Sequence, residues 1–60
     1  MPQRWEAILT YLHHHPGPQR PVDVGRELGM EKGVRDVMRR MKARGLLQGQ
    51  AGSYELAAPR

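Results

Sequence analysis

The sequence predicts a mainly α-helical fold that closes with a small β-hairpin, in the order helix, helix, helix, strand, strand. In two segments apolar residues recur at i, i+3, i+4 and i+7, which is the spacing of an amphipathic helix. After residue 45 the pattern changes to a short apolar run and then to alternation, which is typical of strands. Prolines and glycines separate the segments, so we expect residues 1–60 to form one small domain.

The first helix is expected over residues 3–15, and it ends where Pro16-Gly17-Pro18 interrupts helical backbone. Pro2 is well suited to the start of such a helix. One face carries four apolar side chains: Trp5, Ile8, Leu9 and Leu12. We expect this face, including the tryptophan, to lie in the core.

A shorter helix is expected over residues 21–28, with Pro21 in its first turn and with Val24 and Leu28 on one face. Gly25 is unusual inside a helix, where glycine costs about 1 kcal/mol relative to alanine. It is explained if another helix backbone passes close by; the alternative is simple tolerance in a short helix. Gly29 is expected to end this helix in the left-handed conformation.

The third helix is expected over residues 32–44, with Gly45 ending it. Its apolar stripe consists of Val34, Val37, Met38 and Met41. At roughly 100° per residue, the opposite face carries Lys32, Arg35, Asp36, Arg39, Arg40 and Ala43. Asp36 has the right spacing to pair with Lys32 and with Arg40, so we expect it to orient these cations rather than to contact a base.

The hairpin is expected over residues 46–57. A short apolar run, 46–48, precedes a four-residue loop with two glycines, 49–52. Residues 53–57 then alternate, which puts Tyr54 and Leu56 on one side of the second strand. Tyr54 either packs beneath the hairpin through its ring or offers its hydroxyl to a phosphate.

Composition limits what so small a protein can do. The chain has no cysteine, which excludes disulfides and thiolate metal sites. The consecutive histidines at 13–15 point about 100° apart on a helix, so they do not converge on one metal ion. The sequence holds no nucleophile with a convergent base and no phosphate-binding glycine loop. We therefore expect no enzyme activity, no cofactor and no metal.

Charge points to the class of partner. The formal net charge is +4, and six of the ten basic residues lie between positions 32 and 44, which favours a polyanion and above all a nucleic acid. No apolar run approaches the roughly 18 residues that span a bilayer, and residues 1–15 lack the continuous apolar stretch of a signal peptide. We expect a cytoplasmic protein, associated with the nucleoid if its source is bacterial or archaeal.

From Trp5 to Ala57 the sequence resembles a winged helix-turn-helix domain. The resemblance is carried by Ile8-Leu9 and Leu12, by Val24-Gly25-Arg26-Glu27-Leu28-Gly29-Met30, and by the apolar positions from Val34 to Leu47. Many bacterial and archaeal transcription regulators share this skeleton. The resemblance implies that the third helix enters the major groove of double-stranded DNA, and that the hairpin, or wing, contacts the backbone or the neighbouring minor groove.

The resemblance and the charge pattern together select the candidate DNA-binding residues. By position, the recognition face carries Lys32, Arg35, Arg39 and Arg40, and the wing region carries Gln48, Gln50 and Ser53. Guanidinium groups make forked hydrogen bonds that suit phosphates and guanine edges. Lys42 and Arg44 flank this face and suit phosphates. Arg20 either helps the N-terminus of the second helix to bind a phosphate or is a solvated loop residue.

The skeleton is also similar to the Z-DNA-binding domains of RNA-editing adenosine deaminases. Those domains use an asparagine and a tyrosine four residues apart on the third helix, together with a proline-rich wing that holds a tryptophan. Here Arg35 and Arg39 occupy the two helix positions, and Gly52-Ser53-Tyr54 contains no proline. We therefore do not expect recognition of left-handed DNA.

These observations predict a small protein, such as a transcriptional regulator, that binds double-stranded DNA with or without sequence specificity. Because one such module covers a short half-site, we expect tight binding to need a homodimer or a larger complex. The alternative is an interaction module that docks its basic face on an acidic partner, such as a transcription or replication complex. RNA binding is a third alternative, but aromatic residues for base stacking are sparse.

Overall fold

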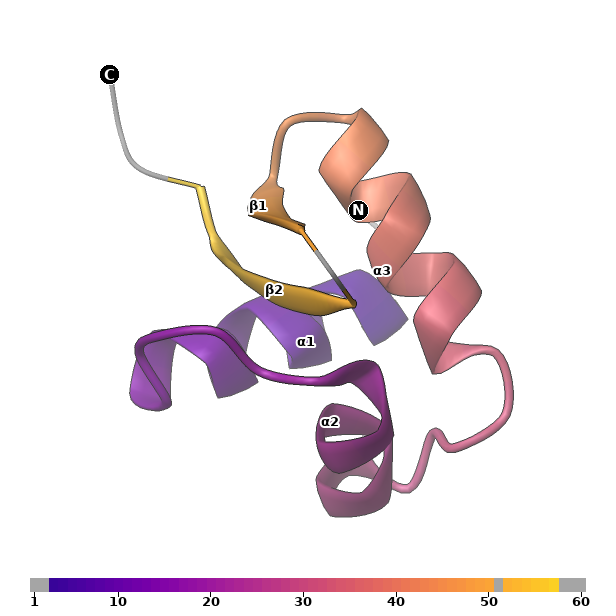
Figure 1. The fold of residues 1–60 in the computed structure, drawn as a ribbon. Coiled ribbons are helices and arrows are strands. Elements are labelled where there is room, and N and C mark those ends of the chain that lie inside the picture. The colour runs from indigo at the N-terminus through magenta and orange to yellow at the C-terminus, as the bar shows by residue number, and fades with distance from the viewer. Residues whose placement is uncertain (1–2, 51, 58–60) are drawn as a thin grey trace.

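The computed structural model describes residues 3–50 and 52–57, and these form three helices followed by one hairpin (Figure 1). Helix α1 spans Gln3–His14, α2 spans Pro21–Leu28 and α3 spans Val34–Ala43. Strands β1 (Leu47–Gln50) and β2 (Ser53–Leu56) pair antiparallel. The predicted fold class is confirmed. Pro2 and Ala51, which entered the predictions for the first helix and the loop, lie outside the described residues.

The core is built by all three helices and by the first strand. Its buried side chains are Ile8, Leu12, Val24, Val34, Met38, Met41 and Leu47. Half-buried apolar residues surround them, among them Trp5, Val37 and Tyr54. Within the described part of the chain no polar or charged side chain is buried, so every cation of the candidate site lies at the surface. None of the described helices combines the length and the apolar character needed to cross a bilayer.

Gly25 lies where α2 meets the turn that leads into α3. A Cβ built on Gly25 would stand 2.9 Å from Val34 Cγ1 and 3.1 Å from Glu31 Cα. A close approach therefore explains the glycine, but the backbone that approaches belongs to Met30 and Glu31, between α2 and α3, so the expectation of a second helix backbone is wrong. Gly29 ends α2 with φ 68°, in the left-handed conformation expected for it.

Helix α3 begins later than predicted and ends as expected. Gly33 has φ 82°, and a left-handed residue cannot continue a right-handed helix, so the helical backbone starts at Val34. Lys32 therefore belongs to the preceding turn, and its predicted place on the helix is wrong. At the other end the N–H of Gly45 donates to Lys42 O at 2.9 Å and the N–H of Leu46 donates to Met41 O at 3.0 Å, which closes the helix.

The hairpin is tighter than the sequence indicated. Leu47 pairs with Leu56 and Gln50 pairs with Ser53, so only residues 51–52 remain between the strands instead of four. The difference arises at Gly49, which stays in the strand with φ 156°, where an added Cβ would collide with the carbonyl oxygen of Ser53. Gly49, which the sequence pattern placed in the loop, therefore lies in β1 at a point where the backbone of β2 leaves no room for a side chain.

The second strand is also tied to the segment before α2. The N–H of Gln19 donates to Tyr54 O at 2.8 Å, and the N–H of Tyr54 donates to Gln19 O at 2.9 Å. Nothing in the sequence pattern predicted this bridge, because one residue pair leaves no periodic signal. It holds the hairpin beside the start of α2 and so determines where Arg20 lies relative to the wing.

Replacing Gly25 with alanine is expected to destabilise the protein by roughly 1 kcal/mol, although alanine is the better helix former. The added methyl group overpacks against Val34 and the backbone of Glu31, which costs typically 1–3 kcal/mol and outweighs about 1 kcal/mol of helix propensity. Urea unfolding followed by circular dichroism measures the change. Glu27→Ala, on the exposed side of the same helix, serves as the control and is expected to change stability by less than about 0.5 kcal/mol. A Gly25→Ala protein as stable as the parent would contradict the close packing.

Candidate nucleic-acid interface

The outward face of α3 is strongly basic. Burial of Val34, Met38 and Met41 fixes the rotation of the helix about its axis and turns the opposite side toward solvent. That side presents three exposed arginines: Arg35, Arg39 and Arg40. The apolar periodicity alone therefore identified the correct exposed side of the helix.

Asp36 is the acidic residue of this face, and it holds two of the arginines. Its Oδ1 accepts a hydrogen bond from Arg39 Nη2 at 2.6 Å, and its Oδ2 lies 3.1 Å from Arg40 Nε. The Arg40 pair is the predicted i, i+4 contact, whereas the Arg39 pair was not predicted. The arginine side chains stay 75% and 71% exposed, and ion pairs so exposed contribute on the order of 0–1 kcal/mol. Asp36 thus orients both cations without burying them.

Lys32 takes no part in this cluster. Asp36 pairs with Arg39 and Arg40 in the described part of the chain, and the predicted pair with Lys32 is wrong. The reason is the left-handed Gly33, because the i, i+4 neighbour relation holds only along continuous helix. Lys32 is exposed in the turn between α2 and α3.

Two of the cations expected at phosphates tie α3 to other elements. Lys42 Nζ donates to the carbonyl oxygen of Gly49 in β1 at 2.7 Å. The guanidinium carbon of Arg44 lies 5.7 Å from the centre of the Trp5 ring in α1, which is within the range of a cation–π contact. Both residues are exposed, so their charges stay at the surface while their contacts hold the C-terminal end of α3 in place.

Arg20 lies directly before α2, where no side chain caps the helix. Its Nε donates to Asp23 Oδ2 in the first turn at 3.2 Å, and its side chain remains 69% exposed. The neighbouring carboxylate reduces the local positive charge at this helix N-terminus. The phosphate-binding role of Arg20 stays a prediction.

The polar residues of the wing are divided between the two strands. Gln48 Nε2 donates to Glu55 Oε1 on the opposite strand at 2.8 Å, so the glutamine amide is engaged within the hairpin. Gln50 and Ser53 form the last strand pair before the loop. Tyr54 is half-buried and packs against the core. This agrees with the alternative in which its ring packs beneath the hairpin.

One hollow brings together residues from three elements that are far apart in the sequence. It has a volume of about 380 Å³, and it is lined by Arg20, Pro21, Val22, Arg35, Gly52 and Tyr54. Three of these, one from each of the α2, α3 and wing regions, were candidates from the sequence. Their convergence follows from the bridge between Gln19 and Tyr54 described above.

Val22 in this hollow was missed by the sequence analysis. Its side chain is 44% exposed, and among the described residues it is the large apolar side chain that lies most clearly in solvent. A signal was available, since Val22 stands two positions and therefore about 200° from the buried Val24 on the same helix. An apolar residue on the polar side of a short helix is a candidate contact residue.

The histidines at the end of α1 make contacts of their own. His14 Nδ1 donates to the carbonyl oxygen of Thr10 at 2.9 Å, and the ring of His15 stacks on Tyr11 with centroids 4.1 Å apart. Over residues 3–50 and 52–57 the structure contains no group of three side chains from His, Cys, Asp and Glu that could hold a metal ion.

No family model, no curated protein and no solved structure matches the chain. Three helices followed by an antiparallel hairpin are consistent with a winged-helix-like topology.

Replacing Lys42 with methionine is expected to loosen the hairpin without unfolding the protein. Methionine keeps most of the aliphatic length and removes only the donor to Gly49, whose net contribution is about 1 kcal/mol. Amide hydrogen exchange should become faster at residues 48–50 and 53–55, while the core of α3 keeps its protection. Lys32→Met, which removes a lysine from the turn before α3, is the control and should leave hairpin exchange unchanged. Equal protection in both variants would show that Lys42 does not hold the wing.

Proposed function

We propose that this protein binds double-stranded DNA as a small winged-helix regulator, with α3 in the major groove and the hairpin on the adjoining backbone. The observation that supports the proposal is the outward row of arginines on α3, opposite the buried side chains of Val34, Met38 and Met41. A helix about 10–12 Å across fits the major groove, and arginine is the side chain that most often contacts guanine there.

Arg35 is the residue best placed for a base contact. It lies in the second position of α3, and recognition helices contact base edges with their N-terminal residues. In the described part of the chain its guanidinium has no hydrogen bond and no ion pair, so binding a base breaks no internal contact of this side chain. Its position in the hollow also puts it next to Arg20 and the wing.

The other cations suit positioning on the phosphate backbone. Arg39 and Arg40 can exchange Asp36 for phosphate at little cost, because their ion pairs are exposed. Lys42 retains further donors beside the one that holds Gly49, so it can hold the wing and attract a phosphate together. The proposed mechanism is therefore electrostatic docking by several cations and base contact by Arg35.

A protein partner is the second candidate, and Val22 favours it. An exposed valine in the same hollow as Arg20 and Arg35 fits a peptide that carries an apolar side chain next to a carboxylate. A phosphodiester backbone offers little apolar surface to such a residue. In this alternative the same hollow receives an acidic segment of a larger transcription or replication complex.

Arg35→Ala is expected to weaken binding to duplex DNA by roughly tenfold, because one good base contact contributes about 1–3 kcal/mol. Fluorescence anisotropy with a labelled random duplex, at two salt concentrations, measures the affinity and its salt dependence. Arg26→Ala removes the same charge from the exposed side of α2 and is expected to change binding far less. The parent protein's affinity should fall steeply with salt, since docking releases counterions from DNA. If both variants bind alike, α3 is not the contact surface; if no duplex is bound, the protein-partner alternative is favoured.

Asp36→Asn is expected to strengthen binding to random duplex DNA by about fivefold. It removes a negative charge that faces the phosphates, which corresponds to about 1 kcal/mol at 4 Å in water. Glu27→Gln makes the same change of charge on the exposed side of α2 and should have a smaller effect. The same anisotropy titration compares the two. Weaker binding of the Asp36→Asn protein would show instead that the carboxylate itself accepts a hydrogen bond from the DNA.

A further inference from the structure

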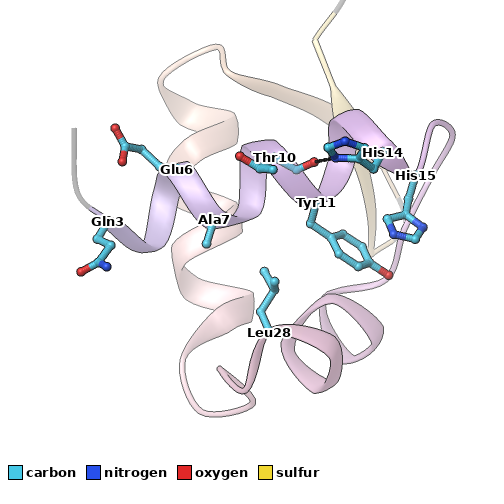
Figure 2. A pocket seen from close by; sticks show the side chains of 8 residues that line it. All are labelled: Gln3, Glu6, Ala7, Thr10, Tyr11, His14, His15 and Leu28. Carbon is cyan, nitrogen blue, oxygen red and sulfur yellow. Dashed lines mark hydrogen bonds between the residues drawn. The ribbon is translucent and has the colours of Figure 1, made fainter.

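The outer side of α1 carries a broad hollow that the proposed DNA contacts do not use. It has a volume of about 590 Å³, and Figure 2 shows Ala7 of α1 pointing toward Leu28 of α2, with the Tyr11 ring beside His15. In Figure 1 α1 lies at the back of the molecule, and Figure 2 looks onto its outer side, with α3 behind it. The hollow and the basic face thus lie on different sides of the protein.

The charge of this surface differs from that of the rest of the chain. Of the ten lysines and arginines, none is among the eight side chains that line the hollow. The half-buried floor is formed by Ala7, Tyr11 and Leu28. A protein with a net charge of +4 repels copies of itself over most of its surface, but this side can approach a second copy without placing cations opposite cations.

The residues along the centre of this side follow the spacing of a helix-pairing seam. Gln3, Ala7, Thr10 and His14 are separated by four, three and four positions, which is the spacing of the contact positions in paired helices. The two central residues are small, so a second helix can come close. The two outer residues of this row, Gln3 and His14, are polar and stand at the two ends of α1.

We propose that the outer side of α1 is a homodimer surface, on which the α1 helices of two copies pair antiparallel about a two-fold axis. An axis between Ala7 and Thr10 places Ala7 of each copy opposite Thr10 of the other, and Gln3 opposite His14. The His14 ring already donates through Nδ1 to Thr10 O, which leaves Nε2 to accept from the Gln3 amide of the second copy.

The position of Glu6 supports the antiparallel direction. Glu6 lies in the N-terminal half of the lining and the histidines lie at its C-terminal end. Antiparallel pairing about this axis places Glu6 of each copy opposite Tyr11 of the other, whereas parallel pairing would bring the two Glu6 carboxylates together. The opposed helix dipoles favour the same direction.

Such a dimer contains two basic α3 faces, and neither face takes part in the contact between the subunits. Each α3 stays on the side of its subunit away from the α1 contact, as the two views indicate. One face of a 12-residue helix buries less than the about 800 Å² per partner of a standard stable complex, so we expect reversible association at micromolar to millimolar concentrations. The proposal concerns the free protein and does not depend on the proposed DNA binding.

Sedimentation equilibrium of the full chain without DNA, from micromolar to millimolar concentration, tests the proposal. The mass should rise from that of one chain toward that of two. Thr10→Arg should lower the association constant tenfold or more, because the two-fold axis brings the two new cations together. Ala43→Arg adds the same charge to an exposed position of α3 and should associate as the parent does.

Two further measurements keep the test decisive. Circular dichroism verifies that both variants keep the helical content of the parent. Amide chemical shifts followed over concentration should change at residues 3–14 and near Leu28. A parent protein that stays monomeric at millimolar concentration, equal association of the two variants, or shifts confined to α3 and the hairpin would each overturn the proposal.

Discussion

Burial of the apolar stripe of α3 is the constraint on which the rest of this structure depends. Val34, Met38 and Met41 fill the centre of a core that holds no polar side chain among the described residues. A helix with three buried positions at this spacing has one allowed rotation about its axis, because any other would expose methionine and bury arginine. The orientation of the basic face therefore follows from packing and not from attraction to any partner.

The glycines and backbone bridges determine how the other elements stand relative to α3. Gly25 allows the turn before α3 to pass within contact distance of α2. The backbone hydrogen bonds between Gln19 and Tyr54 hold the hairpin beside the start of α2. The hydrogen bond from Lys42 to Gly49 O holds the hairpin beside α3. A small core alone leaves a two-stranded hairpin only marginally stable, so these polar contacts hold the wing where the candidate site needs it.

The cations of the region from 32 to 44 have different tasks despite their similar chemistry. Arg35 has no intramolecular partner in the described structure, whereas Arg39 and Arg40 share Asp36. Lys42 and Arg44 reach the hairpin and the Trp5 ring. In the proposed DNA complex, Arg35 would contact a base and the other cations would position the protein on the phosphates. The outer side of α1 differs from this basic face, because no lysine or arginine lines its hollow.

The sequence by itself determined the helices, the hairpin and the exposed side of α3, because all of these follow from the period of apolar residues and from the conformations open to proline and glycine. It also predicted the pair of Asp36 with Arg40, which depends on helical spacing alone. Only the tertiary structure decided that Lys32 lies before α3, that Lys42 bonds to Gly49, and that Arg20, Arg35 and Tyr54 surround one hollow with Val22. These contacts join residues distant in the chain or depend on one left-handed glycine, and neither leaves a periodic trace in the sequence.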